Sequence, residues 1–165
     1  MTSIRFEELQ KSHLPEVLEI YSYYVLNTTA TFHTVVPSLD EMWAIFFAEH
    51  PIYGTFVIYD DDKICGYVIL GQHKKREAYN RTAEVSVYLQ PDYIGKGIGS
   101  KALQYIEEYA RTKDLHVLVA TICGENNKSI NVFERNGFIK CAHYKETGKK
   151  FGKYLDVVAY QKLLK

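Results

Sequence analysis

Residues 88–103 read YLQPDYIGKGIGSKAL, and in this stretch Gly95, Gly97 and Gly99 alternate with other residues between a strand-like run and a helix-like run. The N-terminus of a helix carries unpaired N–H groups and partial positive charge, and it therefore favours an anion. Glycine has no side chain to hold a pyrophosphate away from such a backbone. The stretch predicts a phosphate-binding turn with Lys96 at its rim, and a tight turn without a ligand is the alternative interpretation.

Two other phosphate-binding motifs do not fit these residues. The GxxxxGK[ST] loop of nucleotide-hydrolysing proteins needs a serine or threonine after its lysine, but Gly97 follows Lys96. The GxGxxG motif of dinucleotide-binding folds needs one more residue before its third glycine than the chain has before Gly99. The sequence therefore disfavours nucleotide hydrolysis and hydride transfer.

Hydrophobic spacing predicts strands and helices along the rest of the chain. We expect strands at residues 3–9, 55–59, 64–70, 82–89, 116–122, 138–146 and 154–163. We expect one helix with Ser12 as its N-cap, one with a Ser38–Glu41 capping box, and two more at residues 100–112 and 126–135. A polar loop is expected at residues 72–80, and turns are expected at 60–63 and 148–152.

Composition restricts the class of protein. The chain has 165 residues, of which 47% are hydrophobic, so residues 1–165 are expected to form a single domain with its own core. Lysine plus arginine number 20 and aspartate plus glutamate also number 20, so no net field favours a nucleic acid or a membrane as partner. Three cysteines without a CxxC pair and six histidines without HxxxH spacing predict no disulfide framework and no metal site. We expect a cytoplasmic protein.

Several motifs occur in an order that identifies a family. The stretch IGKGIG at residues 94–99 is followed by Asn126-x-x-Ser129 and by Asn-Gly-Phe at 136–138. The chain thereby resembles the GNAT superfamily of acetyl-CoA-dependent N-acetyltransferases, although Ile94 stands where the family usually has arginine or glutamine. The stretches TATF (29–32), REAY (76–79), TAEVSVY (82–88) and GKKFGKYLD (148–156) are similar to the phosphinothricin and methionine sulfoximine acetyltransferase branch.

The resemblance implies a mixed α/β fold in which helices flank a central, mostly antiparallel, twisted sheet. It also implies acetyl-CoA as co-substrate, a small amino acid or amino-acid analogue as acceptor, and direct transfer without an acyl-enzyme. A homodimer is common in this branch. The cofactor-binding residues that it implies are Val87, Tyr88, Leu89, Gly95, Lys96, Gly97, Ile98, Gly99, Ser100 and Asn126. Asn126 is also well suited to cap a helix, and both roles are compatible.

Glu84 is the candidate catalytic base. Alternation along the predicted strand places Glu84, Ser86 and Tyr88 on one face of the sheet. An amine must lose a proton before it attacks a thioester, so a positioned carboxylate is useful. A solvent-facing carboxylate is the plainer interpretation, but Glu84 matches the catalytic glutamate proposed for the resembled branch.

The basic segment 72–76 is the candidate substrate site. Arginine presents a planar pair of donors to a carboxylate, and the resemblance implies that Arg76, with Lys74 nearby, holds the acidic end of an amino acid. Phe32 and Tyr79 would supply apolar walls. A solvated charged loop is the alternative interpretation.

Three further hypotheses follow from the residues and the resemblance. Phe133 stands where many family members have a tyrosine, or in this branch a histidine, that protonates the departing thiolate, and phenylalanine donates no proton. A catalytically silent acyl-CoA-binding module and an acetyltransferase for protein or peptide N-termini are the alternatives to a small-molecule acetyltransferase.

Overall fold

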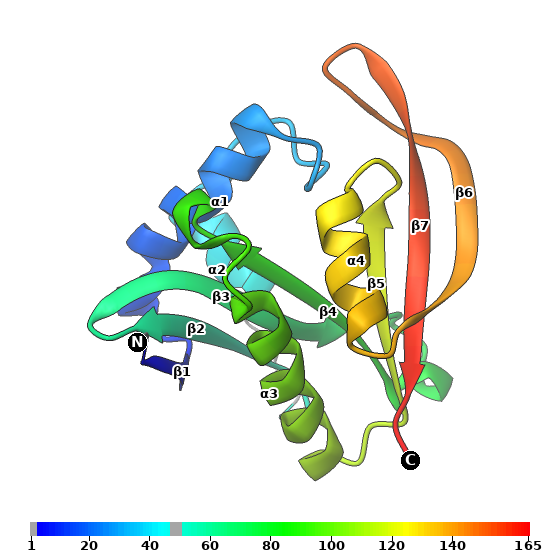
Figure 1. Ribbon diagram of the computed structural model, residues 1–165, viewed down its shortest axis with the longest axis horizontal. Coiled ribbons are helices and arrows are strands. Elements are labelled where there is room, and N and C mark those ends of the chain that lie inside the picture. Colours follow the sequence, from blue (N-terminus) through cyan, green and yellow to red (C-terminus); the bar gives the residue numbers. More distant parts are fainter. Residues whose placement is uncertain (1–2, 47–50) are drawn as a thin grey trace.

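The computed structural model describes residues 3–46 and 51–165. Seven strands form one sheet in the order β1-β2-β3-β4-β5-β7-β6, and every neighbouring pair is antiparallel except β4 and β5 (Figure 1). The strands are β1 (Ile4–Glu8), β2 (Gly54–Asp60), β3 (Lys63–Gln72), β4 (Thr82–Leu89), β5 (Val117–Cys123), β6 (Ile139–Lys150) and β7 (Lys153–Leu163). The predicted mixed α/β fold with a mostly antiparallel sheet is confirmed.

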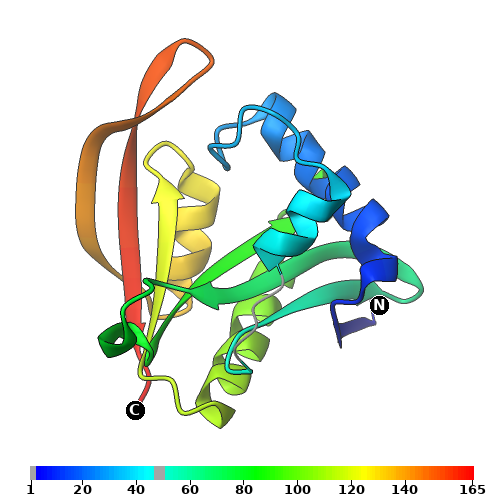
Figure 2. The same cartoon turned by 180° about the vertical axis from the view of Figure 1, so that it is seen from behind.

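Helices cover both faces of the sheet (Figures 1 and 2). They are α1 (Leu14–Asn27), α2 (Leu39–Phe46), α3 (Ile98–Thr112) and α4 (Asn127–Arg135), with short 3-10 helices η1 (Lys11–His13), η2 (Glu77–Tyr79) and η3 (Pro91–Tyr93). One hydrophobic core joins α3 and α4 to residues such as Val85 and Leu118. A second core joins α1 and α2 to the opposite face at Val57 and Tyr67.

Strands β4 and β5 diverge along part of their length. They pair over three residues, from Thr82 opposite Val117 to Glu84 opposite Val119. Beyond Glu84 the strand β4 continues to Leu89 and stays paired with β3 on its other side. The second half of β4 therefore has an edge without a partner strand.

Several local predictions are confirmed and others are wrong. Ser38 and Glu41 form the capping box, with Glu41 N–H donating to Ser38 Oγ at 3.1 Å and Ser38 N–H to Glu41 Oε1 at 3.0 Å. Ser12 does not cap α1, because η1 takes up this turn and His13 is the N-cap residue without a capping side-chain bond.

The predicted turn at 148–152 is too long. The strand β6 runs on to Lys150, and the turn consists of Phe151 and Gly152, both with positive φ (53° and 75°). The predicted loop at 72–80 contains the last residue of β3 and the 3-10 helix η2.

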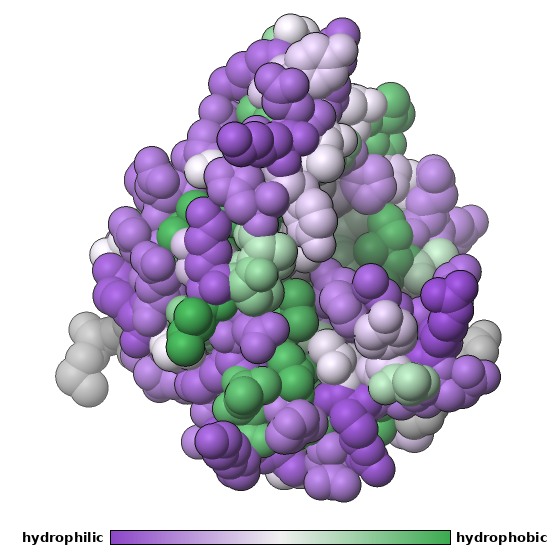
Figure 3. Space-filling view, turned by 90° about the vertical axis from the view of Figure 1, so that its right-hand side faces the viewer, coloured by the Kyte–Doolittle hydropathy of each residue, from purple (hydrophilic) through white to green (hydrophobic). Residues whose placement is uncertain are grey.

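The hairpin of β6 and β7 forms one side of the molecule. Most residues of β6 are exposed, among them Ile139 and Tyr144. Figure 3, turned toward this side, shows hydrophilic residues over its upper part and hydrophobic residues gathered in its lower half. Among the described residues, no helix is long and apolar enough to cross a membrane.

Candidate active site

A cavity of about 440 Å³ opens where β4 and β5 diverge. Its walls come from the second half of β4, the end of β5, the first turns of α3 and α4, and the end of α1 with the residues that follow it. Of the residues that the sequence predicted to bind cofactor, it is lined by Val87, Tyr88, Leu89, Gly99 and Asn126. Elements distant in the chain therefore meet around one space.

The wall formed by β4 is held by a residue that the sequence did not single out. The Tyr24 hydroxyl donates a hydrogen bond to the Leu89 carbonyl oxygen. Burial raises the pKa of Tyr24 to about 12, so this donor stays protonated at neutral pH. The Tyr88 ring packs with its centroid 5.4 Å from those of Tyr21, Tyr24 and Tyr67. Tyr21, Tyr24, Tyr67 and Tyr88 thus form a tyrosine cluster that supports the unpaired edge of β4.

The three glycines have two different environments. Gly95 and Gly97 adopt positive φ (84° and 81°), and a β-carbon built on either would have no atom within 4 Å. Gly99 lies within α3, and its β-carbon would lie 3.4 Å from Val132 of α4. Two glycines therefore serve the turn and leave open space before it, whereas the third allows α3 to pack closely on α4.

The turn presents backbone donors at the start of α3. The first helical bond there joins Lys101 N–H to the Gly97 carbonyl at 3.2 Å. The N–H groups of Ile98, Gly99 and Ser100 precede it and have no acceptor within the helix. The Ile98 side chain is buried in the core beneath this turn. Unpaired N–H groups at the start of a helix favour an anion.

The polar side chains of the turn have other contacts. The Ser100 hydroxyl accepts a hydrogen bond from Asn136 at 3.0 Å, and Lys96 Nζ lies 5.2 Å from the ring centroid of Tyr93. At the opposite wall, Asn126 Oδ1 accepts the Ser129 N–H at 3.3 Å, so Asn126 caps α4 and lines the cavity at once.

Glu84 lies where β4 leaves β5, beside the cavity. One of its oxygens is 2.9 Å from His73 Nδ1, and the other is 3.4 Å from Thr121 Oγ1, whose residue lines the cavity. His73 directly follows β3, and the antiparallel register that pairs Gly71 with Glu84 brings it there. The sequence placed His73 in a basic segment but gave no signal of this contact.

Three of the predicted substrate residues lie on the segment that follows β3. Lys74 Nζ lies 5.3 Å from the ring centroid of Tyr79, and the Tyr79 ring meets His73 edge-on at 5.7 Å. Arg76 is exposed, and no carboxylate within residues 3–46 and 51–165 forms an ion pair with it. Through His73 this segment therefore lies next to Glu84, and its Arg76 guanidinium is available to bind an anion.

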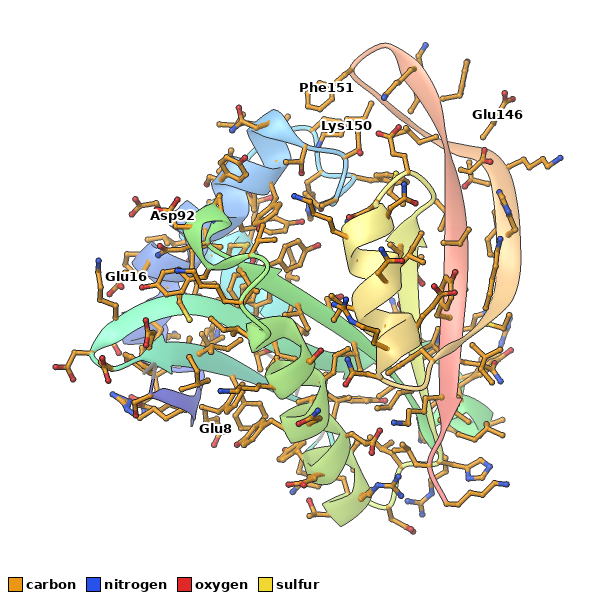
Figure 4. The ribbon with its side chains drawn as sticks, viewed as in Figure 1. Glu8, Glu16, Asp92, Glu146, Lys150 and Phe151 are labelled. Carbon is orange, nitrogen blue, oxygen red and sulfur yellow. The ribbon has the colours of Figure 1, made fainter. Side chains whose placement is uncertain are left out.

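Phe32 lies elsewhere, on the segment after α1. Its ring packs over Gly148 of β6, where a β-carbon would overlap it. The nearby Lys150 side chain is buried and donates to the carbonyl oxygens of Thr31 at 2.8 Å and Tyr24 at 3.5 Å, and this burial lowers the pKa of Lys150. Figure 4 shows Lys150 near the tip of the hairpin, on the side that faces the end of α1.

A second contact joins the same parts of the fold. Glu125 lines the cavity and accepts hydrogen bonds from Thr29 Oγ1 at 2.7 Å and Lys153 Nζ at 3.1 Å. These bonds lower the pKa of Glu125, with the Thr29 hydroxyl contributing most. Lys150 and Glu125 thereby fix the segment after α1 against the β6–β7 hairpin.

Two further residues, Phe133 and Cys123, are buried. Phe133 lines the cavity, and its ring centroid lies 5.0 Å from that of Phe138. Cys123 ends β5 within the core. Across the part of the chain that the structure describes, no three His, Cys, Asp or Glu side chains come together as a metal site would require.

Comparisons with known proteins agree with this geometry. A sequence model described as the acetyltransferase (GNAT) family matches residues 13–138. The L-amino acid N-acyltransferase MnaT of Escherichia coli (strain K12) is 33% identical over 160 residues, which cover 96% of this chain and 92% of that protein. An L-methionine sulfoximine/L-methionine sulfone acetyltransferase of Pseudomonas paraeruginosa is 35% identical over 150 residues, or 90% of this chain and 87% of that protein.

A solved structure extends the similarity to the whole fold. A GNAT superfamily phosphinothricin acetyltransferase from Sinorhizobium meliloti, in complex with acetyl-CoA, superposes with a TM-score of 0.91 at 30% sequence identity. The match covers 99% of this chain and 88% of that one.

Proposed function

This chain belongs to the acetyltransferase (GNAT) family, and we propose that it transfers the acetyl group of acetyl-CoA to the amino group of a small amino acid or amino-acid analogue. The observation that carries this proposal is the cavity between β4 and β5. Its walls include the unpaired edge of β4 and Gly99 at the start of α3, and Glu84 lies beside it, in contact with the lining residue Thr121. Bound acetyl-CoA supplies an acetyl group activated as a thioester.

The residues of the cavity suit the parts of acetyl-CoA. The N–H groups of Ile98, Gly99 and Ser100 have no acceptor within the helix, and a β-carbon on Gly95 or Gly97 would have no atom within 4 Å. Unpaired donors beside open space suit a pyrophosphate. The edge of β4 from Val87 to Leu89 offers backbone groups to the amide-containing pantetheine arm, as a strand edge does to a peptide. Asn126 lines the opposite wall.

Glu84 acts as the base in this proposal. An amino group is mostly protonated at neutral pH, and Glu84 accepts the proton that the amine loses, directly or through a water molecule. The amine nitrogen then bonds to the acetyl carbon as the carbon–sulfur bond breaks and coenzyme A leaves as its thiolate. Phe133 lines the cavity and cannot protonate this thiolate, so the proton comes from water or from the amine itself.

The segment after β3 selects the acceptor. Arg76 has a guanidinium without an ion-pair partner in the described residues, which suits the carboxylate or the phosphinate of an amino-acid analogue. Lys74 and Tyr79 extend this surface toward His73 and Glu84. Relatives named for L-amino acids and for methionine sulfoximine support this class of acceptor.

We further propose that residues 1–165 act as one catalytic domain and that the protein forms a homodimer in the cytoplasm. The exposed Ile139 and Tyr144 of the edge strand β6 support a contact between two copies. The seven-stranded sheet, which takes strands from both ends of the chain, supports a single domain.

A thiol-release screen tests the proposed function. The acceptors are the free L-amino acids, methionine sulfoximine, methionine sulfone, phosphinothricin and a short peptide with a free N-terminus. We expect release of coenzyme A with one or more of the free amino acids or analogues and little with the peptide. Release with the peptide alone would favour a protein N-terminal acetyltransferase, and calorimetric binding of acetyl-CoA without release in any arm would favour a silent binding module.

A further inference from the structure

The carboxylate of Glu84 is held from two neighbouring strands. His73 Nδ1, at the end of β3, lies 2.9 Å from Oε2, and Thr121 Oγ1, on β5, lies 3.4 Å from Oε1. A carboxylate oxygen accepts, so Nδ1–H is the donor in the shorter contact. The side chains of His73 and Glu84 are 21% and 35% exposed, so water competes only in part for this hydrogen bond.

We propose that His73 is a positioning residue for acetyl transfer: it fixes the Glu84 carboxylate beside the cavity so that the amine of the acceptor meets it in one orientation. This inference rests on the proposed role of Glu84 as the base. A glutamate side chain has several rotatable bonds, and an unrestrained carboxylate would spend only part of its time in the productive orientation. The hydrogen bond from His73 restricts these rotations from the β3 side of Glu84, and Thr121 contacts the carboxylate from the β5 side.

The register of the sheet explains why His73 is suited to this task. Gly71 pairs with Glu84 across β3 and β4, and residues two apart on a strand share a face. His73 is the first residue after β3, two residues beyond Gly71, and its imidazole reaches Glu84 at 2.9 Å. The contact is therefore formed directly at the end of the strand pairing.

His73 also links the base to the acceptor segment. Its ring meets the edge of Tyr79 at 5.7 Å, and Tyr79 carries Lys74 over its face at 5.3 Å. Tyr79, proposed to line the acceptor site, and Glu84, proposed to deprotonate the acceptor, thus contact the same imidazole. Acetyl-CoA is proposed to contact Val87 to Leu89 and the turn at Gly97 instead, which are separate from this imidazole.

The experiment compares variants that keep or remove the donor. His73→Phe retains a ring for the Tyr79 contact but has no N–H, and His73→Asn places an amide N–H near the position of Nδ1–H. Each is measured by steady-state kinetics with the best acceptor of the screen, by calorimetry with acetyl-CoA, and by thermal unfolding. His73→Leu replaces His73→Phe if the larger ring prevents folding. His116→Leu, at an exposed histidine outside the site, is the matched control.

We expect His73→Phe to lower kcat by between about tenfold and a hundredfold, with little change in the KM and Kd for acetyl-CoA. His73→Asn should recover most of kcat, and His116→Leu should behave like the parent. In a Glu84→Gln background, His73→Phe should change kcat by less than about twofold, because its effect passes through Glu84.

Three results would overturn the inference while leaving Glu84 as the base. One is a parental kcat in both His73→Phe and His73→Leu beside an impaired Glu84→Gln. The second is equal impairment in His73→Asn and His73→Phe. The third is a full additional loss of kcat when His73→Phe is added to Glu84→Gln. A parental kcat in Glu84→Gln would overturn the role of Glu84 and this inference with it.

Discussion

Gly66 of β3 lies directly opposite Leu89 of β4, and a β-carbon built on Gly66 would lie 2.5 Å from the Tyr88 carbonyl oxygen and 3.1 Å from Leu89 Cα. Backbone atoms cannot move away as the end of a side chain can. The edge that lines the cavity therefore depends on the missing side chain at Gly66 in the neighbouring strand.

Gly66→Ala should displace the edge of β4 and weaken acetyl-CoA binding. Overpacking of a fitted interior typically costs about 1–3 kcal/mol, so we expect a lower melting temperature and a Kd for acetyl-CoA raised by about tenfold. Calorimetry and thermal unfolding measure the two effects. Gly71→Ala is the control on the same strand, because its β-carbon would meet nothing closer than Ile69 Cγ2 at 3.8 Å. Equal Kd values for acetyl-CoA in Gly66→Ala and Gly71→Ala would show that a β-carbon at Gly66 does not displace the edge of β4.

Gly97→Ala tests the turn before α3. Gly97 and Gly152 both have positive φ and open space at a β-carbon, so alanine should cost about 1–2 kcal/mol of folding free energy at either position. Gly97→Ala should also weaken acetyl-CoA binding, because the added methyl group and the altered backbone lie where the pyrophosphate is proposed to bind. Denaturant unfolding and calorimetry on both variants separate strain from binding. The assignment of the turn is wrong if Gly97→Ala and Gly152→Ala bind acetyl-CoA equally well.

The identity of the residue at position 133 should matter little. A thiol has a pKa of about 8.5, so a departing thiolate is stable enough to leave without a side-chain acid. Phe133→Tyr adds a proton donor to a wall of the cavity and should change kcat by less than about tenfold. Turnover of both proteins between about pH 6 and 9 is the measurement. A larger gain that increases with pH would mean that thiolate protonation limits the reaction.

The tyrosine cluster predicts how stability depends on alkaline pH. Burial raises the pKa of Tyr21, Tyr24, Tyr67 and Tyr88 above the ordinary value of 10.0, with Tyr24 at about 12. The unfolded chain then loses tyrosine protons at a lower pH than the folded protein does. The stabilising effect is fully present below pH 10 and is lost as the pH rises from there through the folded-state values. Denaturant unfolding at a series of pH values measures this loss of stability, and absorbance reports the formation of tyrosinate over the same range.

Tyr67→Phe is the informative variant within that cluster. The Tyr67 hydroxyl is buried and has no hydrogen-bond partner among the described residues. Its removal should stabilise the protein at neutral pH by about 1 kcal/mol and reduce the alkaline loss of stability. Tyr154 is exposed and lies outside the cluster, so Tyr154→Phe should alter neither quantity. A destabilised Tyr67→Phe would mean that the hydroxyl makes a contact that the structure lacks.

The sequence was most informative where a function depends on local backbone. Alternation along residues 82–89 predicted the strand β4 and the face of Glu84, and the glycine spacing predicted a turn at the start of a helix. The same spacing could not separate Gly99 from the others, because its role depends on Val132 in a different helix.

Contacts between distant segments were not predictable from residue patterns. The bond of Tyr24 to the Leu89 carbonyl joins residues 65 positions apart, and that of Lys150 to Thr31 joins residues 119 positions apart. Each depends on how the sheet brings α1 to the end of β4 and to the β6–β7 hairpin. His73 and Glu84 are closer in sequence, but their contact depends on the register of two strands.

The central claim is that the cavity between β4 and β5 carries out acetyl transfer with Glu84 as the base. The direct measurement is the kcat of Glu84→Gln for the best acceptor of the screen, together with the Kd for acetyl-CoA from calorimetry. We expect a kcat lowered by about a hundredfold or more and an unchanged Kd, because glutamine keeps the size of the side chain but accepts no proton. A parental kcat in a folded Glu84→Gln protein that binds acetyl-CoA normally would contradict it.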